Sequence, residues 1–254
     1  MLMKKRLLTL LLTLGSMLLP TVMLAEARKE VSPQEASIYP FHLTQALIAK
    51  RASGQTTRGT GIYLGKGTFL TAAHNLTNER GQLWSGQTIH TYNAQGTEIF
   101  HTGSSAKPYY LSTSYSGYED LKNDLALIQV ESSLGLPTDK QELKLAVYLE
   151  PQKLLGKTVS TMGFSSLTRP PYTQASGKII RVEADGTLTA DLGLVQENSG
   201  SPVFLNGEII GIITAVTEEC QGQSICHQAT ITPLTKDLKE RVLDKFKLGV
   251  RLVN

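Results

Sequence analysis

Three short segments of the sequence contain residue types that together could break a covalent bond. His74 follows the apolar run 68–73, Asp124 precedes the apolar run 125–130, and Ser199 is followed by glycine. A serine hydroxyl is a weak nucleophile near neutral pH and needs a histidine within hydrogen-bond reach to accept its proton. That imidazole needs a buried carboxylate, which fixes its tautomer and stabilises its cationic form. The three residues therefore predict a catalytic triad with Ser199 as nucleophile, His74 as base and Asp124 as orienting carboxylate.

Each of these segments has an ordinary alternative when it is taken alone, because histidines and aspartates often flank strands and Asn-Ser-Gly-Ser-Pro is a good turn sequence. Their order along the chain favours the triad. His, Asp, Ser is a known triad order, whereas Ser, Asp, His is the order of α/β-hydrolases. The G-x-S-x-G motif of those hydrolases is also missing from the sequence. Gly200, directly after the serine, keeps the turn tight and leaves room for a substrate backbone.

Short strands must position these residues. From residue 59 onward, runs of β-branched and aromatic residues alternate with glycine-containing turns. The expected strands are 61–64, 68–73, 88–92, 97–101, 125–130, 158–163, 178–182, 188–191, 203–205 and 208–214. Near the C-terminus, apolar residues recur four positions apart and predict a closing α-helix over about 235–247, with Thr235 as a candidate N-cap. Many short strands and one terminal helix predict an all-β barrel or sandwich.

Composition and charge exclude several classes of protein. The chain has 254 residues, of which 41% are hydrophobic and 19% are charged. This length supports a core without disulfide bonds, and the composition argues against a disordered chain or a coiled coil. The net charge of +3 falls to about +1 without residues 1–27, which contain three basic residues and one acidic residue. A nearly neutral protein gives no reason to expect nucleic acid as a partner.

The N-terminus has the features of an export signal. Residues 1–6 are basic, residues 7–19 are rich in leucine, and Ala25-Glu26-Ala27 supplies the small-x-small pattern of a cleavage site. The apolar run of 13 residues is shorter than the roughly 20 residues that a transmembrane helix needs. We expect a signal peptide over 1–27, cleavage near Ala27, and a secreted (extracellular or periplasmic) product without a stable membrane anchor. An uncleaved anchor is the alternative, and residues 28–55 are a propeptide or an N-terminal arm.

The two cysteines, Cys220 and Cys226, enclose a five-residue loop. In an exported protein this spacing favours a local disulfide bond, with two free buried thiols as the alternative. The spacing is not that of a metal site, and the other histidines are isolated in the sequence, so no metal is expected. These histidines are His42, His90, His101 and His227.

On these residues the sequence resembles the trypsin-like (chymotrypsin-fold) serine endopeptidases, with nearest similarity to the bacterial branch of glutamyl endopeptidases and exfoliative toxins. The resemblance lies in 59–64, in the histidine and aspartate segments, in 176–179, and in 198–204 with 206–212. It implies one protease domain over 56–254. Within that domain it implies two packed six-stranded antiparallel β-barrels, at about 56–140 and about 152–234, and a closing α-helix.

The same resemblance implies what the domain does. Peptide bonds of a protein or peptide substrate would be hydrolysed through an acyl-enzyme, without a cofactor and by a monomer. His74 and Asp124 would come from the first barrel and Ser199 from the second.

One residue departs from the family pattern beside the nucleophile. The family usually has glycine two residues before the serine, where this chain has Glu197. The amides of Glu197 and Ser199 should form the oxyanion hole, in which one lost donor costs roughly 10²–10³ in rate. In one interpretation the Glu197 side chain projects into solvent and only its N–H matters. In the other, the hole is poorly formed until substrate, a partner or N-terminal processing completes it.

The substrate pocket also departs from the known specificities. The resemblance assigns its walls to Gly193, Leu194, Ile213, Thr214 and Val216. Trypsins have aspartate at the position of Gly193, and glutamyl endopeptidases have threonine and histidine at the positions of Leu194 and Ile213. An uncharged residue at P1, the substrate position before the cleaved bond, is therefore expected. Glu218 and Glu219 would reverse this preference if they reached in to meet a basic side chain.

Two other functions remain open for this sequence. One is a secreted protease homologue of low activity that serves as a binding or adhesion module, with Glu197 as its signature. The other is a toxin-like protease that cleaves a single target protein. Labelling of Ser199 by a fluorophosphonate would distinguish the first from an active endopeptidase.

Overall fold

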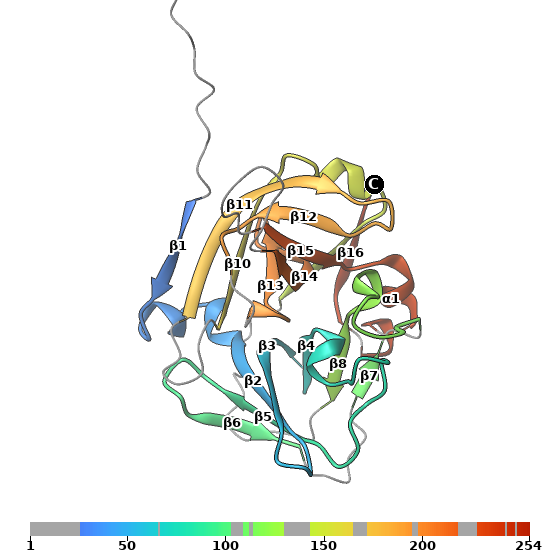
Figure 1. The fold of residues 1–254 in the computed structure, drawn as a ribbon. Helices are drawn as coiled ribbons and strands as arrows, with labels where there is room; N and C mark the ends of the chain where they lie inside the picture. Colours follow the sequence, from blue (N-terminus) through green and yellow to red (C-terminus); the bar gives the residue numbers. More distant parts are fainter. Residues whose placement is uncertain are drawn as a thin grey trace, which may run out of the picture.

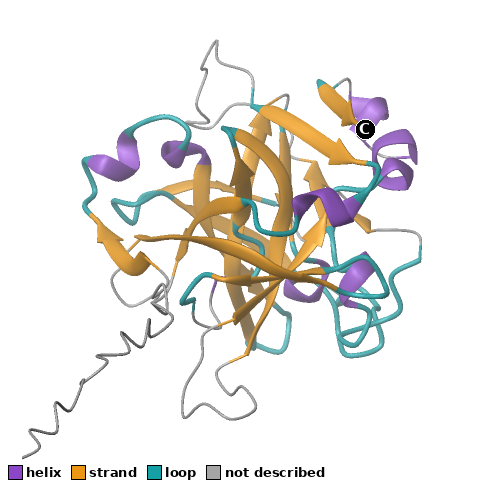
Figure 2. Ribbon diagram, turned by 90° about the horizontal axis from the view of Figure 1, so that it is seen from above, coloured by secondary structure: helices purple, strands orange, loops and turns teal. Residues whose placement is uncertain are grey.

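A computed structural model describes residues 26–254 except 66, 103–108, 112–113, 130–142, 165–171, 195–197, 218–227, 242 and 247. The described residues form two antiparallel-dominated β-sheets, which lie one above the other in Figure 1. The few helical turns lie at the outside of the strands (Figure 2). No helix in the described part of the chain is long and apolar enough to cross a membrane. The predicted all-β, chymotrypsin-like fold with two strand-rich halves is confirmed.

The first sheet contains His74 and Asp124 at the ends of its strands. Its order is β6-β5-β2-β3-β4-β8-β7, and every pairing in it is antiparallel. The strands are β2 (Thr44–Lys50), β3 (Thr56–Gly65), β4 (Thr68–Thr71), β5 (Thr88–Tyr92), β6 (Glu98–His101), β7 (Tyr109–Leu111) and β8 (Ala126–Gln129). This sheet has seven strands rather than the expected six, and no pairing between β6 and β7 closes it within the described residues.

The second sheet closes on itself. Strands β13-β10-β11-β12-β15-β14 follow in order, and β14 pairs back with β13, which completes a six-stranded antiparallel barrel. The strands are β10 (Thr158–Phe164), β11 (Tyr172–Val182), β12 (Leu188–Asp191), β13 (Pro202–Leu205), β14 (Glu208–Thr217) and β15 (Gln228–Pro233). Three further strands extend this sheet: β1 (Glu26–Val31) pairs with β11, and β9 (Lys144–Tyr148) lies parallel between β14 and β16 (Val250–Val253).

The core explains why these runs form strands. β4 is buried along its whole length, and so is the apolar part of β8, because each packs between neighbouring strands inside the first half. The same apolar cluster continues into the second half through Phe204, Ile209 and Ile212. This continuous apolar core holds the two halves of the molecule against each other.

The first sheet begins earlier than the expected boundary at residue 56. β2 lies between β3 and β5, and four of its residues in a row are buried. Its sequence has no clear alternation, so its strand structure depends on neighbours on both edges rather than on its own pattern. Removal of residues 44–50 would take a central strand out of the sheet, which favours the N-terminal arm for this part; the assignment of 28–55 as a propeptide or an N-terminal arm stays a prediction. The expected cleavage site after Ala27 falls within β1.

The C-terminal helix is shorter than predicted. It comprises α1 (Lys236–Arg241), followed by the 3-10 turn η7 (Leu243–Phe246) rather than one helix to residue 247. The predicted cap is confirmed, because the Leu238 N–H donates to Thr235 Oγ1 at 3.2 Å. The chain then continues into β16, a strand that the sequence pattern did not predict. Arg251 on this strand forms an ion pair with Glu208 and lowers the pKa of that carboxyl, which ties the C-terminus to β14.

Candidate active site

His74 and Asp124 meet at the end of the first sheet, as their sequence positions predicted. His74 lies in the 3-10 turn η3 (Ala73–Asn75) just after β4, and Asp124 lies between η4 (Leu121–Asn123) and β8. Because β4 and β8 are paired, with Thr71 opposite Ala126, their adjoining ends bring the two residues together. Fifty residues of separation in the sequence thus become one contact.

Two hydrogen bonds fix the geometry of this pair. Asp124 Oδ2 lies 2.6 Å from His74 Nδ1, and Asp124 Oδ1 accepts the His74 backbone N–H at 2.8 Å. The Asp124 side chain is 1% exposed, whereas that of His74 is 21% exposed. A buried carboxylate therefore holds one ring nitrogen, while the ring keeps access to solvent. This arrangement suits an imidazole that accepts a proton at its other nitrogen.

The Ser199 loop comes from the second half and is joined to the His74 side by backbone contacts. The Ser199 carbonyl accepts hydrogen bonds from Asn75 Nδ2 at 3.1 Å and from the Thr60 N–H at 2.8 Å. Asn75 is the residue directly after His74, so this bond places the serine loop against the histidine turn. Ser199 itself is 9% exposed.

Gly200 is required at this junction for steric reasons. Its φ is +88°, and a Cβ there would lie 2.0 Å from the Thr60 carbonyl oxygen. No other residue fits so close to β3 in that conformation. On the other side of the serine, Asn198 Nδ2 donates to the Phe164 carbonyl at 2.7 Å and holds the loop against β10. The loop is thus clamped from both sides.

Two tyrosines that the sequence did not single out lie near the histidine turn, Tyr118 against the His74 ring and Tyr115 against Thr77. The ring of Tyr118 meets the His74 ring edge-on, with centroids 6.1 Å apart, and its hydroxyl donates to the Thr77 carbonyl at 3.1 Å. Burial raises the pKa of Tyr118 and, more strongly, that of Tyr115 beside Thr77, so both phenols stay neutral as hydrogen-bond groups. Only a tertiary contact shows their role, because nothing in their spacing relates them to His74.

A second contact that the sequence missed links the pocket strand to the aspartate. The Thr232 hydroxyl on β15 donates to the Leu121 carbonyl and lies 3.2 Å from Thr214 Oγ1 on β14. Leu121 begins the 3-10 turn that leads directly into Asp124. Thr214, predicted as a pocket residue, is therefore connected through Thr232 to the segment that positions the carboxylate.

Three of the remaining predicted pocket residues contribute apolar side chains to the core of the second barrel. Leu194 and Ile213 are buried in the apolar cluster of the second barrel, and Val216 packs against the same cluster. Gly193 precedes them with φ +62°. Five residues of the prediction lie outside the described residues: Glu197, Glu218, Glu219, Cys220 and Cys226. The role of the Glu197 amide in the oxyanion hole, the contact of Glu218 or Glu219 with a basic P1 side chain, and the disulfide bond therefore stay predictions.

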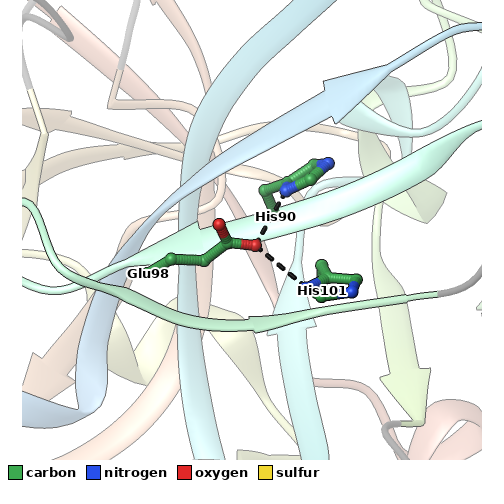
Figure 3. A group of neighbouring side chains, drawn as sticks. All are labelled: His90, Glu98 and His101. Carbon is green, nitrogen blue, oxygen red and sulfur yellow. Dashed lines mark hydrogen bonds and ion pairs between the residues drawn. The ribbon is translucent and has the colours of Figure 1, made fainter.

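The expectation that His90 and His101 are isolated is wrong. His90 on β5 and His101 on β6 lie opposite each other, and both approach Glu98, as Figure 3 shows. Burial tends to raise the pKa of Glu98, but the hydrogen bonds and charges of the two histidines outweigh it and lower that pKa. Of the described residues, these three form the group that could hold a metal ion, and strands β2 and β3 separate their hairpin from β4, after which His74 lies.

Comparisons with known proteins concern the family and the fold of this chain. A family model described as trypsin matches residues 34–236. A search of curated proteins found no match. Among solved structures, the chain is similar to a Glu endopeptidase in complex with MPD, with a TM-score of 0.63 and 14% identity over 87% of this chain and 97% of that one.

Two other solved structures have a similar fold. One is a thermostable serine protease, AL20, from an extremophilic microorganism, with a TM-score of 0.62 and 13% identity over 81% of this chain and 97% of that one. The other is an inactivated protease paralogue of the scabies mite, with a TM-score of 0.63 and 14% identity over 87% of this chain and 99% of that one. At these identities the similarity concerns the fold.

Proposed function

This chain belongs to the trypsin family of serine endopeptidases, and on that premise we propose that Ser199, His74 and Asp124 are its catalytic triad. The observation that carries the proposal is the contact of His74 Nδ1 with the buried Asp124 Oδ2 at 2.6 Å. The hydrogen bond from Asn75 to the Ser199 carbonyl supports it, because it joins the histidine turn to the serine loop.

The proposed reaction follows from the roles of these groups. His74 Nε2 takes the proton of Ser199 Oγ as that oxygen attacks the substrate carbonyl carbon. The amides of Glu197 and Ser199 stabilise the oxyanion that forms. The protonated His74 then gives its proton to the leaving amine, and an acyl-enzyme remains on Ser199. Water, activated by the same histidine, attacks the ester, releases the acid product and restores the serine.

For the substrate, we propose a protein or peptide with an uncharged P1 residue. The glycine at 193, where trypsins carry a counter-charge, supports this, as do the apolar residue types at positions 194, 213 and 216, which the resemblance assigns to the pocket walls. The N-terminal sequence supports a secreted enzyme that is cleaved from its signal near Ala27. Membership of the glutamyl endopeptidase and exfoliative toxin branch belongs to the same proposal.

Labelling with a fluorophosphonate tests the nucleophile directly. The expected result is covalent modification of one residue, Ser199, located by mass spectrometry of the digested protein, because only a base-activated serine reacts with the probe. Heat-unfolded protein serves as the control and should remain unlabelled. An intact protein that takes up no probe would favour the alternative of a binding module on a protease scaffold.

A cleavage profile tests the pocket. In a library of peptides that varies only at P1, we expect the highest kcat/KM for uncharged, apolar side chains. Charged side chains should be at least about 10-fold poorer, since they would lose solvation in an apolar pocket without a partner. Clear preference for Arg or Lys would instead indicate that Glu218 or Glu219 reaches the pocket. Preference for Glu would overturn the assignment of its walls.

A further inference from the structure

A bulged hairpin at the edge of the first sheet brings two imidazoles and one carboxylate to a common point. His90 Nδ1 lies 2.9 Å from Glu98 Oε1, and His101 Nδ1 lies 3.1 Å from the same oxygen. The ligand atoms of all three residues lie within 4.8 Å of one another. Figure 3 shows the two rings directed at the carboxylate from neighbouring strands. They stack with centroids 5.6 Å apart.

The backbone is built so that these side chains share one face. His90 and His101 lie directly opposite each other in the pairing of β5 with β6, so their side chains project to the same side. Glu98 is three residues before His101, and in a regular strand it would point to the other side. The register shifts between these strands, with Tyr92 opposite Glu98 rather than Ile99, and the extra residue of this bulge returns Glu98 to the side of the histidines.

From this convergence we propose that His90, Glu98 and His101 form a binding site for a divalent transition-metal ion, with Zn²⁺ the best fit. Two imidazoles and one carboxylate are a common zinc ligand set, completed by a fourth position open to water. Bonds of about 2.0–2.1 Å at tetrahedral angles place ligand atoms about 3.4 Å apart. The two nitrogen–oxygen distances of 2.9 and 3.1 Å need to widen only slightly to reach that value.

The surroundings of His90 suit this role. Its Nε2 lies 3.2 Å from Thr88 Oγ1, so a neutral ring that binds metal through Nδ1 can carry its proton on Nε2 and donate it to the hydroxyl. Such a second hydrogen bond orients a ligating histidine. The site is accessible to ions, because the side chains of Glu98 and His101 are 39% and 59% exposed while that of His90 is 16% exposed.

The ion would act on the sheet rather than on catalysis. β6 ends the first sheet and its described part has one partner strand, β5, so a metal bridging the two strands would fasten that edge. A ligand that binds only the folded protein stabilises it against unfolding. The site is separate from the proposed triad, because strands β2 and β3 lie between this hairpin and β4, after which His74 lies.

The test is titration of the untagged, chelator-treated full-length protein with ZnSO₄ in a calorimeter, together with melting curves with and without zinc. We expect one zinc ion per chain at this site and a melting temperature that rises with zinc. The variants His101→Gln and Glu98→Gln should each weaken binding at least about 10-fold and abolish the rise. Glu119→Gln, which removes an exposed carboxylate elsewhere, is the matched control and should bind like the original protein.

Visible spectroscopy with Co²⁺ gives a second readout that does not depend on stability. Bound to this site, cobalt should show the intense absorption of four-coordinate geometry, and the His101→Gln variant should lose it. Zinc binding elsewhere, for instance at His74 and Asp124, would persist in both variants. The proposal is overturned if the original protein binds no zinc. It is also overturned if both cluster variants bind zinc as tightly as the original protein while their melting curves without metal show that they are folded.

Discussion

The Ser199→Ala variant is expected to lose about 10⁵- to 10⁶-fold in kcat for peptide hydrolysis. Removal of the hydroxyl leaves no nucleophile, so no acyl-enzyme can form, and losses of this size follow removal of a triad serine. Only slow attack by water, assisted by the oxyanion hole and by substrate binding, would remain. The measurement is kcat and KM on the best substrate from the P1 profile, with KM expected to change far less than kcat.

Ser201→Ala is the matched control for this loss. Ser201 lies two residues further along the same loop and is fully buried, and its backbone N–H donates to the Asn198 carbonyl, a bond that alanine retains. The control should therefore keep most of the activity and react with a fluorophosphonate at Ser199. If Ser199→Ala keeps its activity at the same melting temperature, or still takes up the probe, Ser199 is not the nucleophile.

The Asp124→Asn variant is expected to lower kcat by about 10⁴-fold. The structure gives the reason. Oδ1 of residue 124 accepts the His74 backbone N–H, so an asparagine keeps its oxygen there and turns its NH₂ group toward His74 Nδ1. The ring must then accept a hydrogen bond at Nδ1 and carry its proton on Nε2. That tautomer cannot take the proton of Ser199.

A remote aspartate provides the comparison for this variant. Asp185 caps the turn between β11 and β12 by accepting the Thr187 N–H and hydroxyl through Oδ1, contacts that an asparagine can reproduce. Asp185→Asn should therefore keep full activity. Rates in both variants are to be measured with melting curves, because Asp124 is buried. A folded Asp124→Asn protein with more than about one tenth of the original kcat would contradict the assigned role of the carboxylate.

Much of the fold was predictable because its signals are local. Alternating and fully apolar runs bounded by glycine predicted β4, β5, β6, β8, β10, β12, β13 and β14 close to their observed positions, and β3 and β11 only in their C-terminal parts. Thr235 was predictable as a cap because its hydroxyl bonds within the first turn of the helix that it caps. Strands β2, β9 and β16 were not predicted, although β2 is seven residues long. Their structure depends on strands that lie far away in the sequence.

One part of the candidate site was also predictable from the sequence, and another part was not. Residue type and order were enough to predict the pairing of His74 with Asp124, since the chemistry of a serine nucleophile requires that combination. The sequence could not relate Thr232 to Leu121 or Asn75 to the Ser199 carbonyl, which are 111 and 124 residues apart. These contacts depend on how the two halves pack, and no spacing rule covers them.

The sequence by itself was enough to predict the chemistry proposed for this protein: a serine, a histidine and an aspartate in a known order, carried by short strands. The tertiary structure decided which groups surround them, through the hydrogen bonds that hold the Ser199 loop and through the contact of Tyr118 with the His74 ring. It also decided that His90, Glu98 and His101 converge. The reason is that periodicity predicts only which side of its own strand a residue faces. A single bulged residue or a pairing register, set by packing across the sheet, then decides which side chains meet.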